Sequence, residues 1–200
     1  QGRLRRSREL RAQAIELARR LRWKESESGT LAESALALAL WGRTREVEAE
    51  STAALALSRG RRILGNGASA LALVGADAKA DAILADATKR YPLDAIVQEA
   101  TIPVARALQE PRRGKPDRAL ELLQPAMRFR AHFPAIAYAR GLALLAAKRG
   151  PEAAQEFQQV LDLRDGTPTN PFTTPTHLQL ARAYALAGNA AEARKHYQDF

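Results

Sequence analysis

One spacing recurs along the chain and constrains its fold more than any other feature. A small residue is followed seven positions later by glycine in four places, and by lysine in a fifth. The pairs are Ala35 and Gly42, Ala68 and Gly75, Ala107 and Gly114, Gly141 and Lys148, and Ala181 and Gly188. Glycine accepts the left-handed backbone conformation that closes a helix, so each glycine is expected to end one helix.

Apolar or small residues continue the pattern 12, 16 and 19 positions after each small residue. After Ala68 these are Ala80, Leu84 and Ala87. This spacing places them on one face of a second helix, which can return along the first. The unit is therefore a helical hairpin. A single hairpin cannot bury both of its faces, so the hairpins are expected to stack into a solenoid of about ten to eleven helices.

The composition agrees with an all-α fold. The chain has 42 Ala and 27 Leu among its 200 residues, whereas Val, Ile and Thr together number 21. Alanine and leucine favour helices, and β-branched residues favour strands. There is no cysteine, which excludes disulfide scaffolds, thiolate metal sites and cysteine nucleophiles but does not fix the compartment.

The hairpin pattern resembles the tetratricopeptide repeat (TPR), a unit of two antiparallel helices over about 34 residues. The resemblance implies a TPR-like right-handed superhelical solenoid of antiparallel helix hairpins. Residues 28–200 would form five units, and residues 1–27 would form the second helix of a preceding, truncated repeat. The expected units are 28–58, 61–92, 94–132, 134–164 and 174–200, with a Pro/Thr loop at 165–176.

Four stretches are similar to the C-terminal TPR region of bacterial serine/threonine protein kinases of the acidobacterial type. They are residues 89–94, 118–126, 154–158 and 180–188. No kinase motif is present, so the resemblance implies a non-catalytic regulatory module of a larger bacterial signalling protein. That parent would carry any membrane segment outside this chain.

The resemblance also implies a concave face, lined by the first helices, that binds a peptide or helix. The positions that match the family's groove are Leu36, Leu40, Arg62, Ser69, Leu73, Val104, Leu108, Tyr138, Leu142, Leu145, Leu178, Arg182 and Leu186. This lining is mostly apolar, which suits an amphipathic helix or a hydrophobic segment. Some of these leucines could instead be buried between helices.

The formal charge of +9 is unevenly placed. Residues 1–24 carry nine basic and two acidic residues, a local charge of +7, and the remaining 176 residues carry +2. The helix expected at residues 3–24 is therefore the basic part of the chain. It could attach the protein to an anionic lipid or an acidic partner. Nucleic acid is disfavoured, because no series of stacking aromatics accompanies the charge.

Other motifs favour structural interpretations. Residues 65–70, Gly-Asn-Gly-Ala-Ser-Ala, nearly match a dinucleotide fingerprint but lie in an expected helix rather than after a strand. His132, His177 and His196 have no metal-ligand spacing, so no metal site, cofactor or catalytic residue is predicted.

Pro103 is expected to kink or restart a helix. The loop at 165–176 is either a surface insertion or a flap around Phe172 that contacts a partner.

Three hypotheses stay open at this point. The first is a module that binds a protein or peptide, with self-association through the ends of the array. The second is a domain that senses a small molecule in a closed apolar pocket. The third is electrostatic attachment to anionic lipid or nucleic acid through the basic helix at residues 3–24.

Overall fold

A computed structural model describes residues 2–163 and 171–200, and over these residues the chain is all-α, with eleven α-helices and no strand. The helices are α1 (Gly2–Arg20), α2 (Lys24–Ala39), α3 (Thr44–Leu57), α4 (Arg61–Leu73), α5 (Asp77–Arg90), α6 (Ile102–Gln109), α7 (Pro116–Leu122), α8 (Pro134–Ala146), α9 (Gly150–Asp162), α10 (Thr173–Leu186) and α11 (Ala190–Asp199). Two short segments complete them, the π-helical turn η1 (Val97–Thr101) and the 3-10 turn η2 (Pro125–Phe129). The predicted all-α fold of helix hairpins is confirmed.

The turns at the recurrent glycines are built in one way. The residues seven positions after the small residues all have positive φ: Gly42 (69°), Gly75 (85°), Gly114 (71°), Lys148 (62°) and Gly188 (79°). In the turn after α4, Gly75 N donates to Ala72 O and Ala76 N donates to Leu71 O at 2.9 Å. These bonds satisfy carbonyl groups that the helix end leaves without a partner. The expected role of these positions as helix ends is therefore confirmed.

Small residues allow the two helices of a hairpin to approach closely. A Cβ placed on Gly141 in α8 would lie 2.6 Å from Cε1 and Cζ of Phe157 in α9. Phe157 is fully buried, so its ring has little room to move away. Gly150, the first residue of α9, lies against the backbone at the end of α10, with Ala187 N 2.8 Å from the position of a Cβ. Only glycine fits at these two contacts without a shift of its neighbours.

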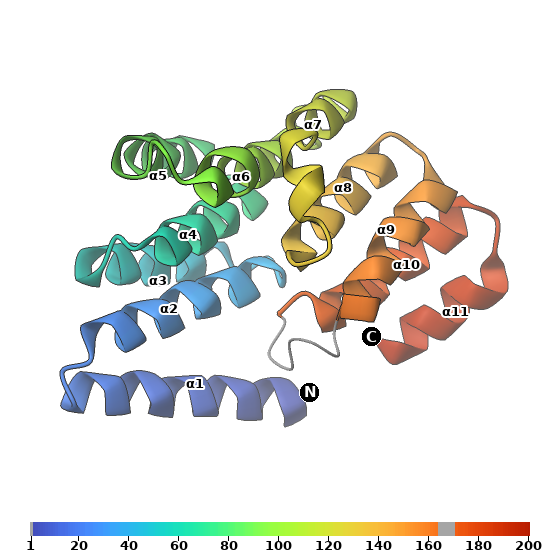
Figure 1. Cartoon of the computed structure of the whole chain (residues 1–200). Coiled ribbons are helices and arrows are strands. Elements are labelled where there is room, and N and C mark those ends of the chain that lie inside the picture. Colours follow the sequence, from blue (N-terminus) through green and yellow to red (C-terminus); the bar gives the residue numbers. More distant parts are fainter. Residues whose placement is uncertain (1, 164–170) are drawn as a thin grey trace. The chain divides into compact units, whose positions relative to one another are not determined.

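The chain divides into two compact units, Gln1–Ala87 and Thr88–Phe200, and the boundary falls within α5. In the first unit α2 packs against α1, α3 and α4 (Figure 1). Leu31, Ala32, Ala54 and Ile63 form a buried apolar cluster there, with Ile15 of α1 packed against it. The hydroxyl of Ser28, fully buried in α2, donates to Ala54 O at 2.8 Å.

In the second unit α9 packs between α8 and α10, and α11 packs on α10 (Figure 1). Three aromatic residues form the centre of this packing. The ring of Tyr138 lies 5.7 Å from that of Phe157 and 4.9 Å from that of Phe172, measured between centroids. All three side chains are buried. The grouping of the helices into five repeats remains a prediction.

Prolines make the first part of the second unit irregular. Pro103 follows the π-helical turn η1, which ends one residue before α6 begins. Proline lacks a backbone N–H and its ring pushes on the preceding turn, and a π-turn relieves both effects. The expected disturbance at Pro103 is therefore a π-turn. Similarly, α7 ends at Leu122, shortly before Pro125.

The expectation of a continuous loop at 165–176 needs correction. Its residues 165–170 lie outside the described part of the chain. Beyond them, α10 already begins at Thr173 and includes Pro175 and Thr176 in its first turn. A proline is tolerated there because the first N–H groups of a helix have no partner within the helix. Phe172 is buried against Tyr138, which contradicts the hypothesis of a flap that presents Phe172 to a partner.

Candidate interaction surfaces

The predicted groove residues differ in their exposure. Five are buried in the folded chain: Leu36, Ser69, Val104, Leu108 and Tyr138. Five are half-buried: Leu40, Leu73, Leu142, Leu145 and Leu178. Three are exposed: Arg62, Arg182 and Leu186. Only the second and third groups present surface to a ligand in this structure, and their role in binding remains a prediction.

The second unit carries five of the accessible positions on two adjacent first helices. Leu142 and Leu145 lie three positions apart on α8, and Leu178, Arg182 and Leu186 follow at intervals of four on α10. These spacings place each set on one side of its helix. The two helices contact one another. We call these five residues the α8–α10 face. It is apolar except for Arg182, whose Nη1 donates to Gln179 Oε1 at 3.3 Å.

Tyr138 has a structural place beneath this face. Its side chain is 2% exposed, so it does not line a groove. Burial raises the pKa of its hydroxyl to about 12. A hydrogen bond with the Gln179 side chain and the charge of Arg182 lower this pKa, but burial has the larger effect. The hydroxyl therefore stays protonated at neutral pH and helps to join α8 to α10.

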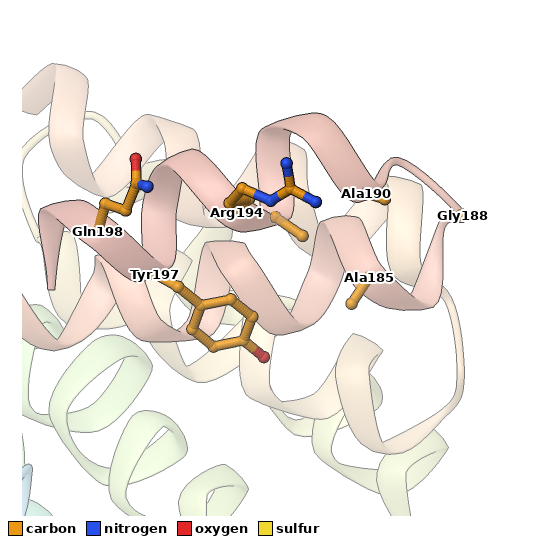
Figure 2. A pocket seen from close by; sticks show the side chains of 7 residues that line it. Ala185, Gly188, Ala190, Arg194, Tyr197 and Gln198 are labelled. Carbon is orange, nitrogen blue, oxygen red and sulfur yellow. The ribbon is translucent and has the colours of Figure 1, made fainter.

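A hollow lies on the last hairpin, which consists of α10 and α11. Figure 2 shows Tyr197, Arg194 and Gln198 of α11 with Ala185 of α10 around it. Its volume is about 490 Å³, and six of its seven lining residues are exposed. A second hollow of about 510 Å³ lies between α9 and the end of α10 and is also lined mostly by exposed residues. Neither hollow is the closed apolar pocket that would favour a small-molecule sensor.

The first helix presents a second apolar surface, in the first unit. Leu10 and Leu17 of α1 are about half exposed, and so is Leu21, which directly follows the end of the helix at Arg20; Trp23 is 59% exposed. Leu10 and Leu17, seven positions apart, share one side of α1, whereas Ile15 and Ala18 face the packed side. Arg6, Arg19 and Arg20 are exposed around them. Glu16 pairs with Arg19 and Arg20, so part of the basic charge is neutralised locally.

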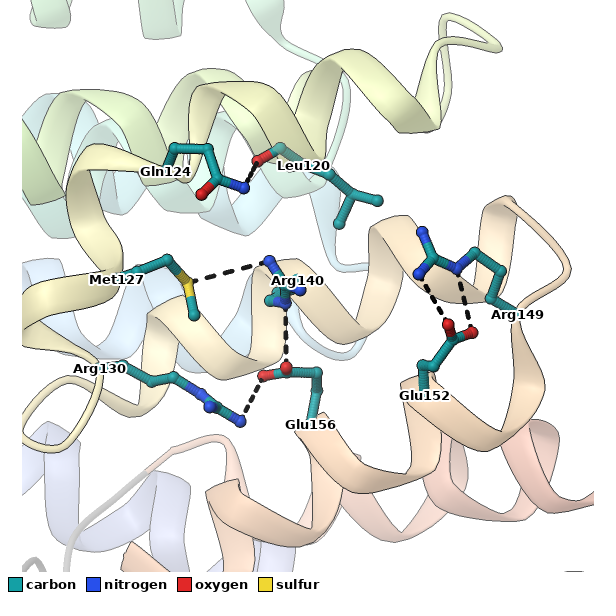
Figure 3. A network of polar contacts seen from close by, with 8 residues as sticks. All are labelled: Leu120, Gln124, Met127, Arg130, Arg140, Arg149, Glu152 and Glu156. Carbon is teal, nitrogen blue, oxygen red and sulfur yellow. Dashed lines mark hydrogen bonds and ion pairs between the residues drawn. The ribbon is translucent and has the colours of Figure 1, made fainter.

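A charged cluster in the second unit is structural. Figure 3 shows Glu156 of α9 between two arginines, with Oε1 2.9 Å from Arg140 Nε and Oε2 3.1 Å from Arg130 Nη2. The Glu156 side chain is 8% exposed, and the guanidinium groups come from α8 and from the residue after η2. This carboxylate joins three segments. Arg140 Nε donates a hydrogen bond to Oε1, whereas Arg130 forms an ion pair with Oε2 without hydrogen-bond geometry.

The structure brings together two histidines that sequence spacing separated. His177 of α10 and His196 of α11 lie with their Nδ1 atoms 3.1 Å apart. Their separation of 19 positions is not a ligand spacing within one helix, so the motif search missed the pair. The hairpin pattern could have indicated this pair. His177 lies one turn before Ala181 in the first helix, and His196 lies near the end of the second helix, which runs back along the first. His132, the third histidine, is exposed.

The remaining motifs lie in ordinary structure. The Gly65–Ala70 segment is inside α4, not in a loop after a strand, which confirms its interpretation as helix. Arg112, Arg113 and Gly114 form the turn between α6 and α7, where Arg113 pairs with Glu110 at 2.8 Å. Over the described residues, no helix combines the length and the apolar character needed to cross a membrane.

Comparison with known proteins agrees with the repeat pattern. Residues 133–199, which form α8 to α11, match the family model of the tetratricopeptide repeat. This match supports a TPR array, and no catalytic family is indicated. No curated protein and no solved structure matches the chain. The match covers the last two hairpins only, and repeats of this family generally mediate contacts between proteins.

Proposed function

We propose that the chain is a non-catalytic protein-interaction module that binds a peptide or an amphipathic helix. The observation that carries the proposal is the α8–α10 face, an accessible apolar stripe with one cation on the two first helices of the hairpins that match the TPR family. Helices bind in such grooves through apolar side chains at intervals of three and four residues. Arg182 would pair with an acidic side chain of the ligand and fix its direction.

The wider context of the module rests on the resemblance to bacterial kinase repeats. We infer that it regulates a larger signalling protein, in which a serine/threonine kinase is the effector domain. The array would then bring a substrate or a regulator to that domain. The groove positions in the first unit, Leu40, Arg62 and Leu73, belong to the same proposal. Arg62 pairs with Glu33 of α2 in the present structure.

The test uses variants of exposed or half-buried leucines on the face. Leu178→Lys and Leu186→Lys place a charge on the apolar stripe, and Leu93→Lys, at a position that is 96% exposed between α5 and η1, is the matched control. Proteins retained by each immobilised variant are compared by quantitative mass spectrometry, after circular dichroism has shown equal helicity. We expect the partners of the wild type to fall at least tenfold with Leu178→Lys and Leu186→Lys and to persist with Leu93→Lys. Equal recovery with all three variants would overturn the proposal.

A second candidate function is attachment of α1 to an anionic lipid surface. The observation that favours it is the exposed set Leu10, Leu17, Leu21 and Trp23 beside exposed arginines. Basic amphipathic helices insert their apolar side at the acyl boundary and use cations to attract anionic headgroups. Binding to vesicles with anionic lipid should fall steeply with salt and be lost in Leu17→Gln/Leu21→Gln. Equal binding by this double variant, or binding to nucleic acid alone, would contradict it.

A further inference from the structure

The facing histidines of the last hairpin form a cluster with an acidic side chain. Besides the 3.1 Å between the two Nδ1 atoms, Asp199 Oδ2 lies 4.0 Å from His177 Nδ1. One ligand atom from each of the three residues lies within 4.8 Å of the other two. His196 is buried, His177 is half-buried and Asp199 is exposed, so the cluster opens to solvent on one side.

We propose that His177, His196 and Asp199 bind one zinc-type divalent cation, with a water molecule as the fourth ligand. Two nitrogens held at about 2.0–2.1 Å by a tetrahedral zinc ion lie about 3.3 Å apart, close to the observed separation. The carboxylate has to move closer to the nitrogens, from 4.0 Å on the His177 side, and such a movement is available to an exposed side chain in the last turn of α11. Imidazole nitrogens favour zinc and its neighbours over magnesium and calcium, which prefer oxygen.

Two neighbouring side chains, Glu192 and Tyr184, lie against the ring of His196. Glu192 Oε2 lies 3.9 Å from His196 Nε2, on the side of the ring opposite the proposed ion. This distance is beyond a hydrogen bond, but a small rotation of the partly exposed Glu192 side chain would bring the carboxylate to Nε2–H, a contact that orients ligating histidines in metal sites. The ring of Tyr184 stacks on that of His196, with centroids 5.6 Å apart and planes 9° from parallel. His196 is therefore held with Nδ1 directed at His177.

The hydrogen bond between the rings is compatible with this role. When two Nδ1 atoms face each other, one must carry a proton and the other must accept it. A cation takes the place of that proton and binds both nitrogens. The consequence is mechanical, because Ala193 and His196 are the only buried residues of α11. The ion would fasten this lightly packed helix to α10.

The experiment is a titration of the full chain with Zn²⁺ and Co²⁺. We expect one ion per chain, visible d–d absorption from tetrahedral Co²⁺, and a higher thermal midpoint with Zn²⁺ but not with Mg²⁺. His177→Ala should weaken Zn²⁺ binding at least a hundredfold and Asp199→Asn about tenfold. Both side chains are accessible, so the variants should fold, whereas His196 is avoided because it is buried.

The matched control is His132→Ala, which removes an exposed histidine outside the cluster. It should bind Zn²⁺ as the wild type does. The proposal is overturned if the wild type shows neither the absorption nor the thermal shift, or if His177→Ala binds Zn²⁺ as tightly as His132→Ala. The proposed binding to a protein partner does not depend on this result, since Leu178 and Leu186 can be varied in metal-free buffer.

Discussion

Single glycines decide how closely helices approach in the second unit. Gly141 faces the buried ring of Phe157, and a side chain at this position has no free space. Gly141→Val should lower the free energy of unfolding by about 1–3 kcal/mol, the usual cost of adding atoms to a packed core. Urea denaturation measures the loss. Ala146→Val, at the exposed end of the same helix, is the control and should change stability by less than about 0.5 kcal/mol. If Gly141→Val and Ala146→Val lowered the free energy of unfolding equally, the ring of Phe157 would have to be able to move aside.

Tyr138 gives the protein a specific response to alkali. Burial raises the pKa of its hydroxyl to about 12, so above the ordinary value of 10.0 the unfolded chain loses this proton first. The stability that Tyr138 provides is complete below pH 10 and is lost between about pH 10 and 12, on the order of 2 kcal/mol. Ultraviolet titration should show a tyrosinate step near pH 12 that disappears in Tyr138→Phe. The same step should remain in Tyr197→Phe, whose ring is exposed, and its loss there would contradict the assignment.

At the scale of the element, the turn after α8 differs from the four turns at Gly42, Gly75, Gly114 and Gly188, because lysine occupies the left-handed position. Lys148 has φ 62°, and a side chain in this conformation costs about 1 kcal/mol or more relative to glycine. Lys148→Gly should therefore raise the free energy of unfolding by about 0.5–1 kcal/mol, as measured by thermal or urea denaturation. The same change inside a helix, Lys89→Gly in α5, should lower it by up to about 1 kcal/mol. A loss of stability in both variants would argue against strain at Lys148.

Two glutamates one turn apart on α9 allow a comparison of buried and exposed ion pairs. Glu156→Gln removes the charge between Arg130 and Arg140 and leaves two partly buried cations without a counterion. It should destabilise the protein by about 1–3 kcal/mol. Glu152 pairs with Arg149 in solvent, and Glu152→Gln should cost less than about 0.5 kcal/mol. The difference is measured by urea denaturation, and similar values for the two variants would show that Glu156 is not a structural anion.

Elements were predictable where local chemistry decides them. The Gly42, Gly75, Gly114 and Gly188 turns follow from spacing, because a positive φ is a property of a few neighbouring residues. At Pro103 the sequence predicts only a disturbed helix and not its form, because a proline within a helix can be accommodated by several backbone conformations, of which a π-turn is one. The expected fifth unit begins at 174, one residue after the start of α10 at Thr173, but the expected loop extended to 176 although the first turn of a helix tolerates proline.

At the scale of the whole molecule, tertiary contacts limit what a sequence can show. The burial of Val104, Leu108 and Tyr138 depends on packing between helices, so the family resemblance that placed them on a groove could not separate a groove from a core. The pairing of His177 with His196 likewise arises only when α11 returns along α10. By contrast, the uneven distribution of charge along the chain could be predicted from the sequence. The excess positive charge belongs mainly to α1, which exposes several of its arginines.

The turns between paired helices have a kinetic consequence. Their closing hydrogen bonds join residues no more than five positions apart, such as Asn189 N and Tyr184 O or Arg149 N and Leu144 O. Contacts this local need little loop closure, so a hairpin can begin to form without distant parts of the chain. Folding can then start at several places and spread to neighbouring hairpins. A chain emerging from the ribosome would be able to order each hairpin soon after its second helix is synthesised.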